Sequence, residues 1–243
     1  MPCLVCGTQK TVKSHLIPRA LVHDIKGEHT SVFEGSAHRT GYKMSQSGPL
    51  DDSILCEVHE RSLSESDRYG VDFCRSFDDV AVKGYQGRGF DVPNRKPGLL
   101  YQFVCSTVWR TAVSNKTLPA DVGLGHYEPI LQADSFANSR EGPELSFLVW
   151  RSQLTSSNHA VSNLIAVPHK IRIDGIRFFR FLVSGLTFDL KVDRRPDFPA
   201  LDLFKANGKD PIIVVCSPPL ELALHPGLAN IFNNMGPPKG KHA

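Results

Sequence analysis

The chain has 243 residues, enough to bury a sizeable hydrophobic core as one large domain or as two small ones. Hydrophobic residues make up 41% and charged residues 22% of the sequence, which is the composition of a folded globular protein and excludes wholesale disorder. The net charge is only +3, so overall charge alone does not indicate a nucleic-acid-binding protein.

In chain order, the patterns of the first 83 residues predict a knuckle, a strand, a helix, a loop-rich stretch with a weak hairpin and a second helix, at residues 1–7, 11–16, 17–25, 27–49 and 56–77. The first helix follows Pro18, and the second is predicted because Leu63, Gly70, Phe73 and Phe77 recur at helical spacing. We interpret residues 1–83 as one compact module.

Residues 84–97 are rich in Gly, Pro and Arg, which is typical of a connection between two parts of a chain. Apolar residues from Leu99 to Val113 mark one side of a helix that begins near Pro97, a residue suited to a first helical turn. The remaining patterns predict a short helix, a strand, a second strand and a closing helix, at residues 127–136, 186–192, 211–216 and 220–232.

The fold class expected from these elements is α+β. The N-terminal module is followed by central helices and by an antiparallel, β-rich C-terminal region. We expect residues 98–243 to pack on the module rather than to be tethered freely, because the connection is short and the helix after it needs a partner for its apolar side.

No apolar run approaches the roughly 20 residues that a membrane-spanning helix needs. The sequence opens on Cys3 and Cys6 rather than on a charged leader followed by a hydrophobic stretch. We therefore expect a cytoplasmic protein without membrane association. In a reducing compartment, closely spaced cysteines are metal ligands more often than they are disulfides.

Four residues have the types and spacing of a zinc site. Cys3 and Cys6 form a Cys-x-x-Cys pair, and Gly7 lets the chain turn sharply after the second thiolate. Cys56 and His59 lie three residues apart at the start of a predicted helix, so both side chains can face one ion. This pattern predicts a structural Zn²⁺ bound by Cys3, Cys6, Cys56 and His59.

Two other uses of these cysteines fit less well. A ligand set of Cys3, Cys6, His15 and His23 has too few residues before its first histidine and too wide a gap between its histidines for a zinc finger. A redox role for Cys3 and Cys6 is disfavoured because the pair does not open a helix in a βαβ pattern.

The residues around the second metal pair resemble part of the HNH endonuclease motif. Asp51-Asp52-Ser53-Ile54-Leu55-Cys56-Glu57-Val58-His59-Glu60 is similar to its C-terminal half, and Lys13-Ser14-His15-Leu16-Ile17-Pro18 is similar to its first half. The resemblance covers roughly residues 1–69 and implies a zinc-stapled treble-clef (ββα-metal) module. It also implies that His15 is the general base that activates water, and that Asp51 takes the Asn position that organises the neighbouring loop.

The sequence departs from this family at two positions that bind the catalytic Mg²⁺ or Mn²⁺. The residue before the base is commonly Asp or His but here is Ser14, and the position one turn into the helix is Ser64. Serine binds divalent cations less well than a carboxylate does. Glu60, Glu65 and Asp67 lie nearby, and Glu65, next to Ser64, is the expected replacement.

The sequence thus predicts a metal-dependent endonuclease that cleaves nucleic acid, with DNA favoured by the resemblance alone, and with an additional protein partner or a homodimer left open. By analogy, small proteins of this type serve mobile elements or defence against phage. The alternative is a non-catalytic, zinc-stabilised module that binds nucleic acid or protein. Carboxylates gathered around His15 would favour the enzyme, and a dry apolar surround would favour the binding module.

Overall fold

A computed structural model describes residues 1–27, 31–35, 42–84, 89–93, 96–114, 123–137, 145–153, 165–206 and 210–219. The protein is a mixed α+β fold with a β-rich C-terminal region, as the sequence predicts. Its largest sheet has seven strands in the order β5-β6-β11-β7-β10-β9-β8. None of the described helices combines the length and the apolar character needed to cross a bilayer.

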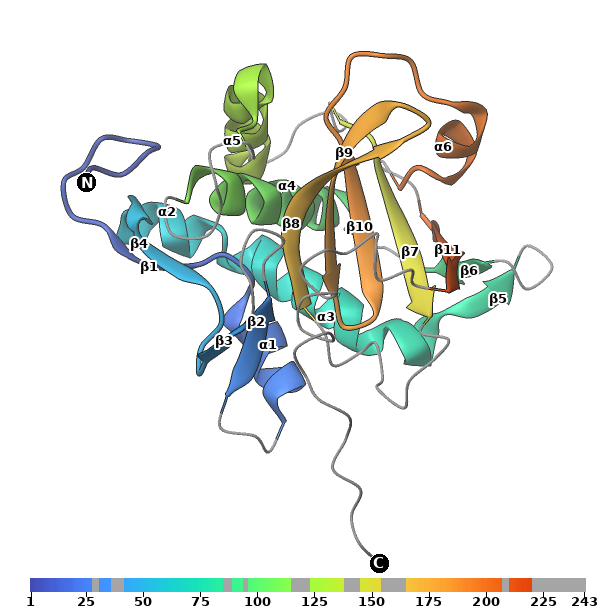
Figure 1. The fold of residues 1–243 in the computed structure, drawn as a ribbon, viewed down its shortest axis with the longest axis horizontal. Helices are drawn as coiled ribbons and strands as arrows, with labels where there is room; N and C mark the ends of the chain where they lie inside the picture. The colour runs from blue at the N-terminus through green and yellow to red at the C-terminus, as the bar shows by residue number, and fades with distance from the viewer. Residues whose placement is uncertain are drawn as a thin grey trace, which may run out of the picture.

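The N-terminal elements are two small sheets and three helices (Figure 1). Strand β1 pairs with β4, and β2 pairs with β3, both in antiparallel register. The bounds of these elements are β1 Val12–His15, α1 Arg19–Lys26, β2 Val32–Gly35, β3 Tyr42–Ser45, β4 Leu50–Leu55, α2 Glu57–Ser62 and α3 Ser64–Val80. The single helix predicted for residues 56–77 is therefore two helices, with Leu63 between them.

The remaining elements form the large sheet and the helices that cover it. Their bounds are β5 Val82–Gly84, β6 Gly89–Val92, α4 Pro97–Val113, a 3-10 turn at Gly125–Tyr127, α5 Glu128–Phe136, β7 Phe147–Gln153, β8 Ile165–Ile173, β9 Ile176–Val183, β10 Leu186–Lys191, α6 Pro199–Phe204 and β11 Ile212–Pro219. The strands predicted at 186–192 and 211–216 and the helices near 97 and 127 are confirmed. The closing helix predicted for 220–232 lies outside the described residues.

The large sheet differs from the expected antiparallel arrangement at one strand pair, because β11 runs parallel to β7. Strand β10 ends beside the start of β7, where Leu190 faces Phe147. The segment that carries α6 therefore crosses only β7, and β11 then begins at the same end of the sheet as β7 and runs parallel to it. The predicted connection at residues 84–97 also contributes a strand, since β6 pairs with β11.

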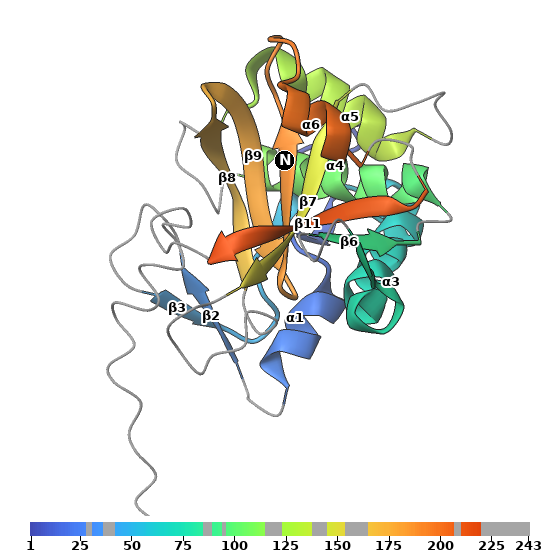
Figure 2. The same cartoon turned by 90° about the vertical axis from the view of Figure 1, so that its right-hand side faces the viewer.

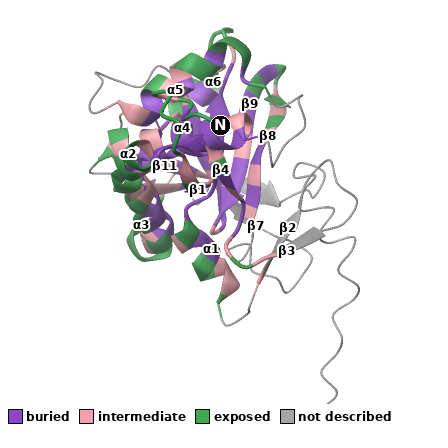
Figure 3. Cartoon of the chain, turned by 90° about the vertical axis from the view of Figure 1, so that its left-hand side faces the viewer, coloured by how far each residue is buried: buried purple, intermediate pink, exposed green. Residues whose placement is uncertain are grey.

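Helix α4 lies at the centre of the core (Figures 2 and 3). It was expected to be apolar on one side, yet eleven of its residues are buried, because the sheet covers one side of it and α3 and α5 cover others. Phe103 of α4 contacts Phe181 and Phe188 of the sheet edge-on, and on the other side it lies against Gly70 of α3. The opposite face of the sheet carries a smaller core in which Leu201 of α6 joins Leu148 and Phe178.

Candidate functional site

The four predicted zinc ligands come together in the structure. The ligand atoms of Cys3, Cys6, Cys56 and His59 all lie within 4.8 Å of one another. The Cys6 and Cys56 sulfurs are 3.8 Å apart, and His59 Nδ1 lies 3.2 Å from the Cys56 sulfur and 3.7 Å from the Cys3 sulfur. Tetrahedral zinc with bonds of about 2.3 Å to sulfur and about 2.0 Å to nitrogen separates its ligand atoms by about 3.5–3.8 Å. The cluster can therefore hold a metal such as zinc.

Local backbone structure explains why the cluster forms. The Gly7 N–H donates to the Cys3 carbonyl, and Gly7 has a φ of 73°, so the chain turns back directly after Cys6. Cys56 is the residue before the first turn of α2, and His59 lies in that turn. Both pairs thus sit on tight turns that present their side chains in one direction.

The thiols lie close enough to influence one another's protonation. Hydrogen bonds from the side chain and the backbone of Thr8 lower the pKa of Cys6 to about 6, which favours the thiolate that binds metal. The backbone N–H of His59 lowers the pKa of Cys56, but burial and the neighbouring Cys6 and Cys3 outweigh it, so that the pKa is raised. A bound cation would relieve the repulsion between the thiolates.

The metal cluster is joined to the rest of the protein through α5. Phe136 packs edge-on against the His59 ring at a centroid distance of 5.4 Å, and it packs in the same way on the fully buried Trp109 of α4. The Gln132 side chain donates a hydrogen bond of 2.9 Å to the Leu4 carbonyl. The knuckle is therefore held by the helices of the central core as well as by its own ligands.

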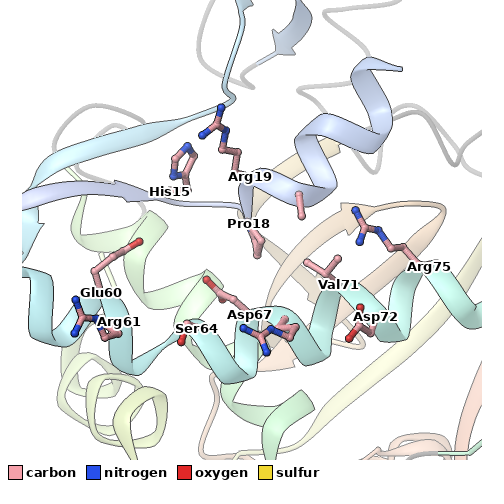
Figure 4. A pocket seen from close by; sticks show the side chains of 12 residues that line it. His15, Pro18, Arg19, Glu60, Arg61, Ser64, Asp67, Val71, Asp72 and Arg75 are labelled. Carbon is pink, nitrogen blue, oxygen red and sulfur yellow. The ribbon is translucent and has the colours of Figure 1, made fainter. Parts of the chain in front are cut away.

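A pocket of about 490 Å³ lies beside the cluster, between α1 on one side and α2 and α3 on the other (Figure 4). His15, at the end of β1, lines this pocket together with Glu60, Ser64 and Asp67. Figure 4 shows the Glu60 side chain rising from α2 toward the imidazole. The structure thus brings three carboxylates, those of Glu60, Asp67 and Asp72, to the pocket of the predicted base.

Burial shapes the protonation of His15 and Glu60. Burial lowers the pKa of His15, the charges of Arg19 and Arg110 lower it further, and Asp67 acts in the opposite direction. Burial also raises the pKa of Glu60, against the effects of Arg110, the Ser14 hydroxyl and the His15 backbone N–H. Among the described residues, neither His15 Nε2 nor Glu60 Oε2 has a hydrogen-bond partner. Both atoms are therefore available for a proton, a water molecule or a cation.

Asp67 is held by a buried cation. Arg110, which is fully buried in α4, donates two hydrogen bonds to the Asp67 carboxylate, at 2.9 and 2.7 Å, and a third to the Ser106 carbonyl at 3.2 Å. This paired geometry fixes the Asp67 carboxylate at the edge of the pocket. It also leaves Glu60 as the lining carboxylate nearest His15 without a salt bridge among the described residues.

The other two predicted site residues lie elsewhere. Asp51 is buried in β4 opposite Ser14, where its carboxylate accepts hydrogen bonds from Ser53 and from the Ser114 hydroxyl at 2.7 Å. Asp51 thereby ties the paired strands β1 and β4 to the end of α4, but it does not line the pocket. Glu65 is also outside the pocket, because its exposed carboxylate points to Lys96 at 3.4 Å.

None of the arginines at the site was predicted from the sequence, and Arg19, Arg68 and Arg110 are three of them. Arg19 follows directly after Pro18, in the same segment as His15, and Arg68 lies one helical turn beyond Ser64. Both line the pocket, and their short distance in sequence from His15 and Ser64 is the signal that could have identified them. Arg110 is the one charged residue in the sequence from residue 99 to residue 113, a pattern that indicates a buried counter-charge.

Comparison of the chain with protein-family models, with curated proteins and with solved structures finds no match.

Proposed function

We propose that this protein is a metal-dependent, HNH-like endonuclease in which His15 is the general base. The observation that carries the proposal is the pocket in which the His15 imidazole lies beside the carboxylates of Glu60 and Asp67. In the same proposal, the knuckle at residues 3–7, the paired strands β1 and β4, and α2 form a zinc-stapled treble clef, with α1, β2 and β3 inserted between the two strands. The pairing of β1 with β4 and the ligand cluster at the start of α2 support this assignment.

His15 has the properties of a base that works at neutral pH. Its lowered pKa keeps the imidazole neutral, and its Nε2 atom has no hydrogen-bond partner among the described residues. A neutral imidazole can take the proton of a water molecule that attacks a phosphodiester. Asp51 contributes indirectly, since the strand it anchors is the one paired with the strand of His15.

The residues present fit a divalent cation through Glu60 rather than through Glu65. Glu60 has a buried oxygen without a partner among the described residues, and oxygen ligands are the ones that Mg²⁺ and Mn²⁺ prefer. A cation held by Glu60, with Asp67 nearby, would supply positive charge against the departing oxygen. Ser14 and Ser64 would leave more of the coordination to water.

One observation favours the alternative, a non-catalytic module that binds nucleic acid or protein. Asp67 is already paired with Arg110, so only one lining carboxylate near His15 is without a salt bridge among the described residues. A plasmid-nicking assay with Mg²⁺ or Mn²⁺ separates the two functions. The proposed enzyme nicks the plasmid, and the binding module does not.

His15→Ala is the decisive variant, and His23→Ala is its matched control because His23 is exposed on α1 and does not line the pocket. A general base contributes about 10²–10⁴-fold to the rate. His15→Ala is therefore expected to lose at least 100-fold of the nicking rate at unchanged zinc content and melting temperature, while His23→Ala keeps the wild-type rate. Equal activity of the two variants would remove His15 from the mechanism.

Glu60→Gln and Glu65→Gln form a second matched pair. Glu60→Gln should raise the Mg²⁺ concentration at half-maximal rate about tenfold or more, because it removes a charged ligand. Glu65→Gln only breaks an exposed ion pair with Lys96, so its Mg²⁺ dependence should be unchanged. The opposite order of effects would return the ligand role to Glu65.

A further inference from the structure

Four arginines line the pocket of His15, and they differ in what neutralises them. Arg61 forms an ion pair with Glu57 at 2.8 Å, and Arg75 donates two hydrogen bonds of 2.8 Å to Asp24. Within the described part of the chain, neither Arg19 nor Arg68 forms an ion pair. Two of the four guanidinium groups therefore have their full hydrogen-bonding capacity available to a ligand, as far as the described residues are concerned.

The carboxylates of the pocket do not neutralise Arg19 and Arg68 in the way that Glu57 and Asp24 neutralise Arg61 and Arg75. Asp67 is held by the two hydrogen bonds from Arg110, and the charge of Asp72 acts on Arg75 together with Asp24. The end of the pocket near Arg75 is thus balanced by its own acidic groups. The charge of Arg19 beside His15 and the charge of Arg68 on α3 have no such balance from an ion pair among the described residues.

Arg19 and Arg68 approach the pocket from opposite walls. Arg19 is the first residue of α1, and Figure 4 shows it beside His15, whose pKa its charge lowers. Arg68 comes from α3, on the wall that carries Ser64 and Asp67. An anion bound by Arg19 would therefore lie next to the imidazole, and Arg68 lines the same pocket from the other wall.

The start of α1 favours an anion at the same place. Pro18, Arg19 and Ala20 all line the pocket, and the first turn of the helix has neither an acidic residue nor a side-chain cap. The N-terminus of a helix carries a partial positive charge and N–H groups without partners in the helix. This contribution adds to that of the two arginines.

We propose that Arg19 and Arg68 bind one phosphodiester group of a nucleic-acid backbone and hold it beside His15. The inference deepens the proposed endonuclease function and rests on it for the identity of the ligand. A guanidinium group presents a planar fork of N–H donors that matches two phosphate oxygens, which suits this role better than a point charge does. The binding is independent of sequence, since the phosphodiester is common to all nucleic acids.

Fluorescence anisotropy with a labelled 20-base-pair DNA duplex tests the proposal, with an RNA duplex of the same sequence as a second arm. The full chain carries His15→Ala, retains its zinc and receives no other divalent cation, so that binding is measured without cleavage. Arg19→Gln and Arg68→Gln are compared with Arg61→Gln, which changes an arginine of the same pocket that Glu57 already neutralises. All three side chains are exposed, so the substitutions leave the core intact.

Removing one phosphate-binding side chain lowers the slope of log K against log salt concentration by about 0.7–0.9. Because the two arginines share one phosphate, Arg19→Gln and Arg68→Gln should each lower the magnitude of that slope by up to this amount and weaken binding several-fold. Arg61→Gln should leave the slope unchanged and the affinity within twofold. If all three variants behave alike, or if the parent protein with His15→Ala alone binds neither duplex, the phosphate site is refuted. The RNA arm decides whether DNA is the preferred source of the phosphodiester.

Nicking assays of the same arginine variants with His15 intact separate this inference from the proposed function. Nicking by wild type together with unchanged binding of Arg19→Gln and Arg68→Gln would remove the phosphate site and leave the endonuclease. The expected binding losses without any nicking would leave the phosphate site and remove the endonuclease.

Discussion

Gly70 of α3 lies where two central helices approach each other most closely, and replacing it with alanine should destabilise the protein. A Cβ atom at this position would lie 2.3–2.6 Å from three carbons of the Phe103 ring. The ring cannot move away easily, because Phe181 and Phe188 hold its other side at centroid distances of 6.1 and 5.9 Å. Helices α3 and α4 must therefore shift apart.

The net cost of Gly70→Ala follows from two opposing terms. Overpacking a rigid core costs about 1–3 kcal/mol, and the three short distances place this site near the upper end. Alanine in the middle of a helix gains about 1 kcal/mol over glycine. The expected loss is about 2 kcal/mol, which lowers the melting temperature of a protein of this size by about 4–8 °C.

Gly98→Ala is the matched control for this prediction. Gly98 is the second residue of α4, and a Cβ atom there would meet nothing within 4 Å. Only the helical gain remains, so the melting temperature should rise by about 1–4 °C. Calorimetry of both variants checks the reasoning. A Gly70→Ala protein as stable as wild type would show that α3 and α4 do not approach each other as closely as described.

Three further predictions concern the metal cluster and the pocket. Elemental analysis should find about one zinc per chain, and Cys56→Ser should give metal-free, unfolded protein, because structural zinc supplies on the order of 10 kcal/mol in small modules; a folded, metal-free wild type would contradict this. Arg110→Met should cost about 3 kcal/mol by leaving Asp67 unpaired, and adding Asp67→Leu should recover part of that loss, as thermal unfolding of both variants would show. If His15 is the base, kcat/KM should fall as pH drops through its lowered pKa, so the midpoint of the acid limb should lie below pH 6.5; a midpoint above 6.5 would exclude this environment for the imidazole.

Spacing over short stretches of sequence predicted the parts of the site that depend on local geometry. The Cys-x-x-Cys pair and the pair three residues apart each sit on one tight turn, so the geometry within each pair needs no knowledge of the rest of the fold. That the two pairs meet depends on the pairing of β1 with β4. Pro97 begins α4 for the same local reason.

The choice of Glu65 depended on a continuous helix, and the structure does not bring this residue to His15. The helix is interrupted at Leu63, so the face of α3 is not a simple extension of the face of α2. Glu65 then faces Lys96, and Glu60, at the end of α2, lines the pocket instead. A periodic pattern cannot locate such a break when apolar spacing continues through it.

The role of α4 and of the strands near residues 82–92 depended on contacts distant in sequence. The apolar spacing of α4 predicts one apolar side of a helix, but its polar residues are buried as well, and Arg110, for example, donates hydrogen bonds to Asp67. Strands β5 and β6 are short, each contains a glycine, and they pair with each other, but only β11, more than 110 residues later, joins β6 to the rest of the sheet. Neither feature can be predicted from neighbouring residues.

The strand order also sets the sequence of events during synthesis. Within the described sheet, the β5–β6 hairpin reaches the other strands only through β11, which is the last described strand of the chain. While residues 212–219 are still inside the ribosome, β6 and β7 both present open edges, and the module that carries His15 has no completed sheet beneath its helices. The seven-stranded sheet therefore cannot be completed until residue 219 has left the ribosome. The proposed nuclease activity would be delayed until that late stage of synthesis.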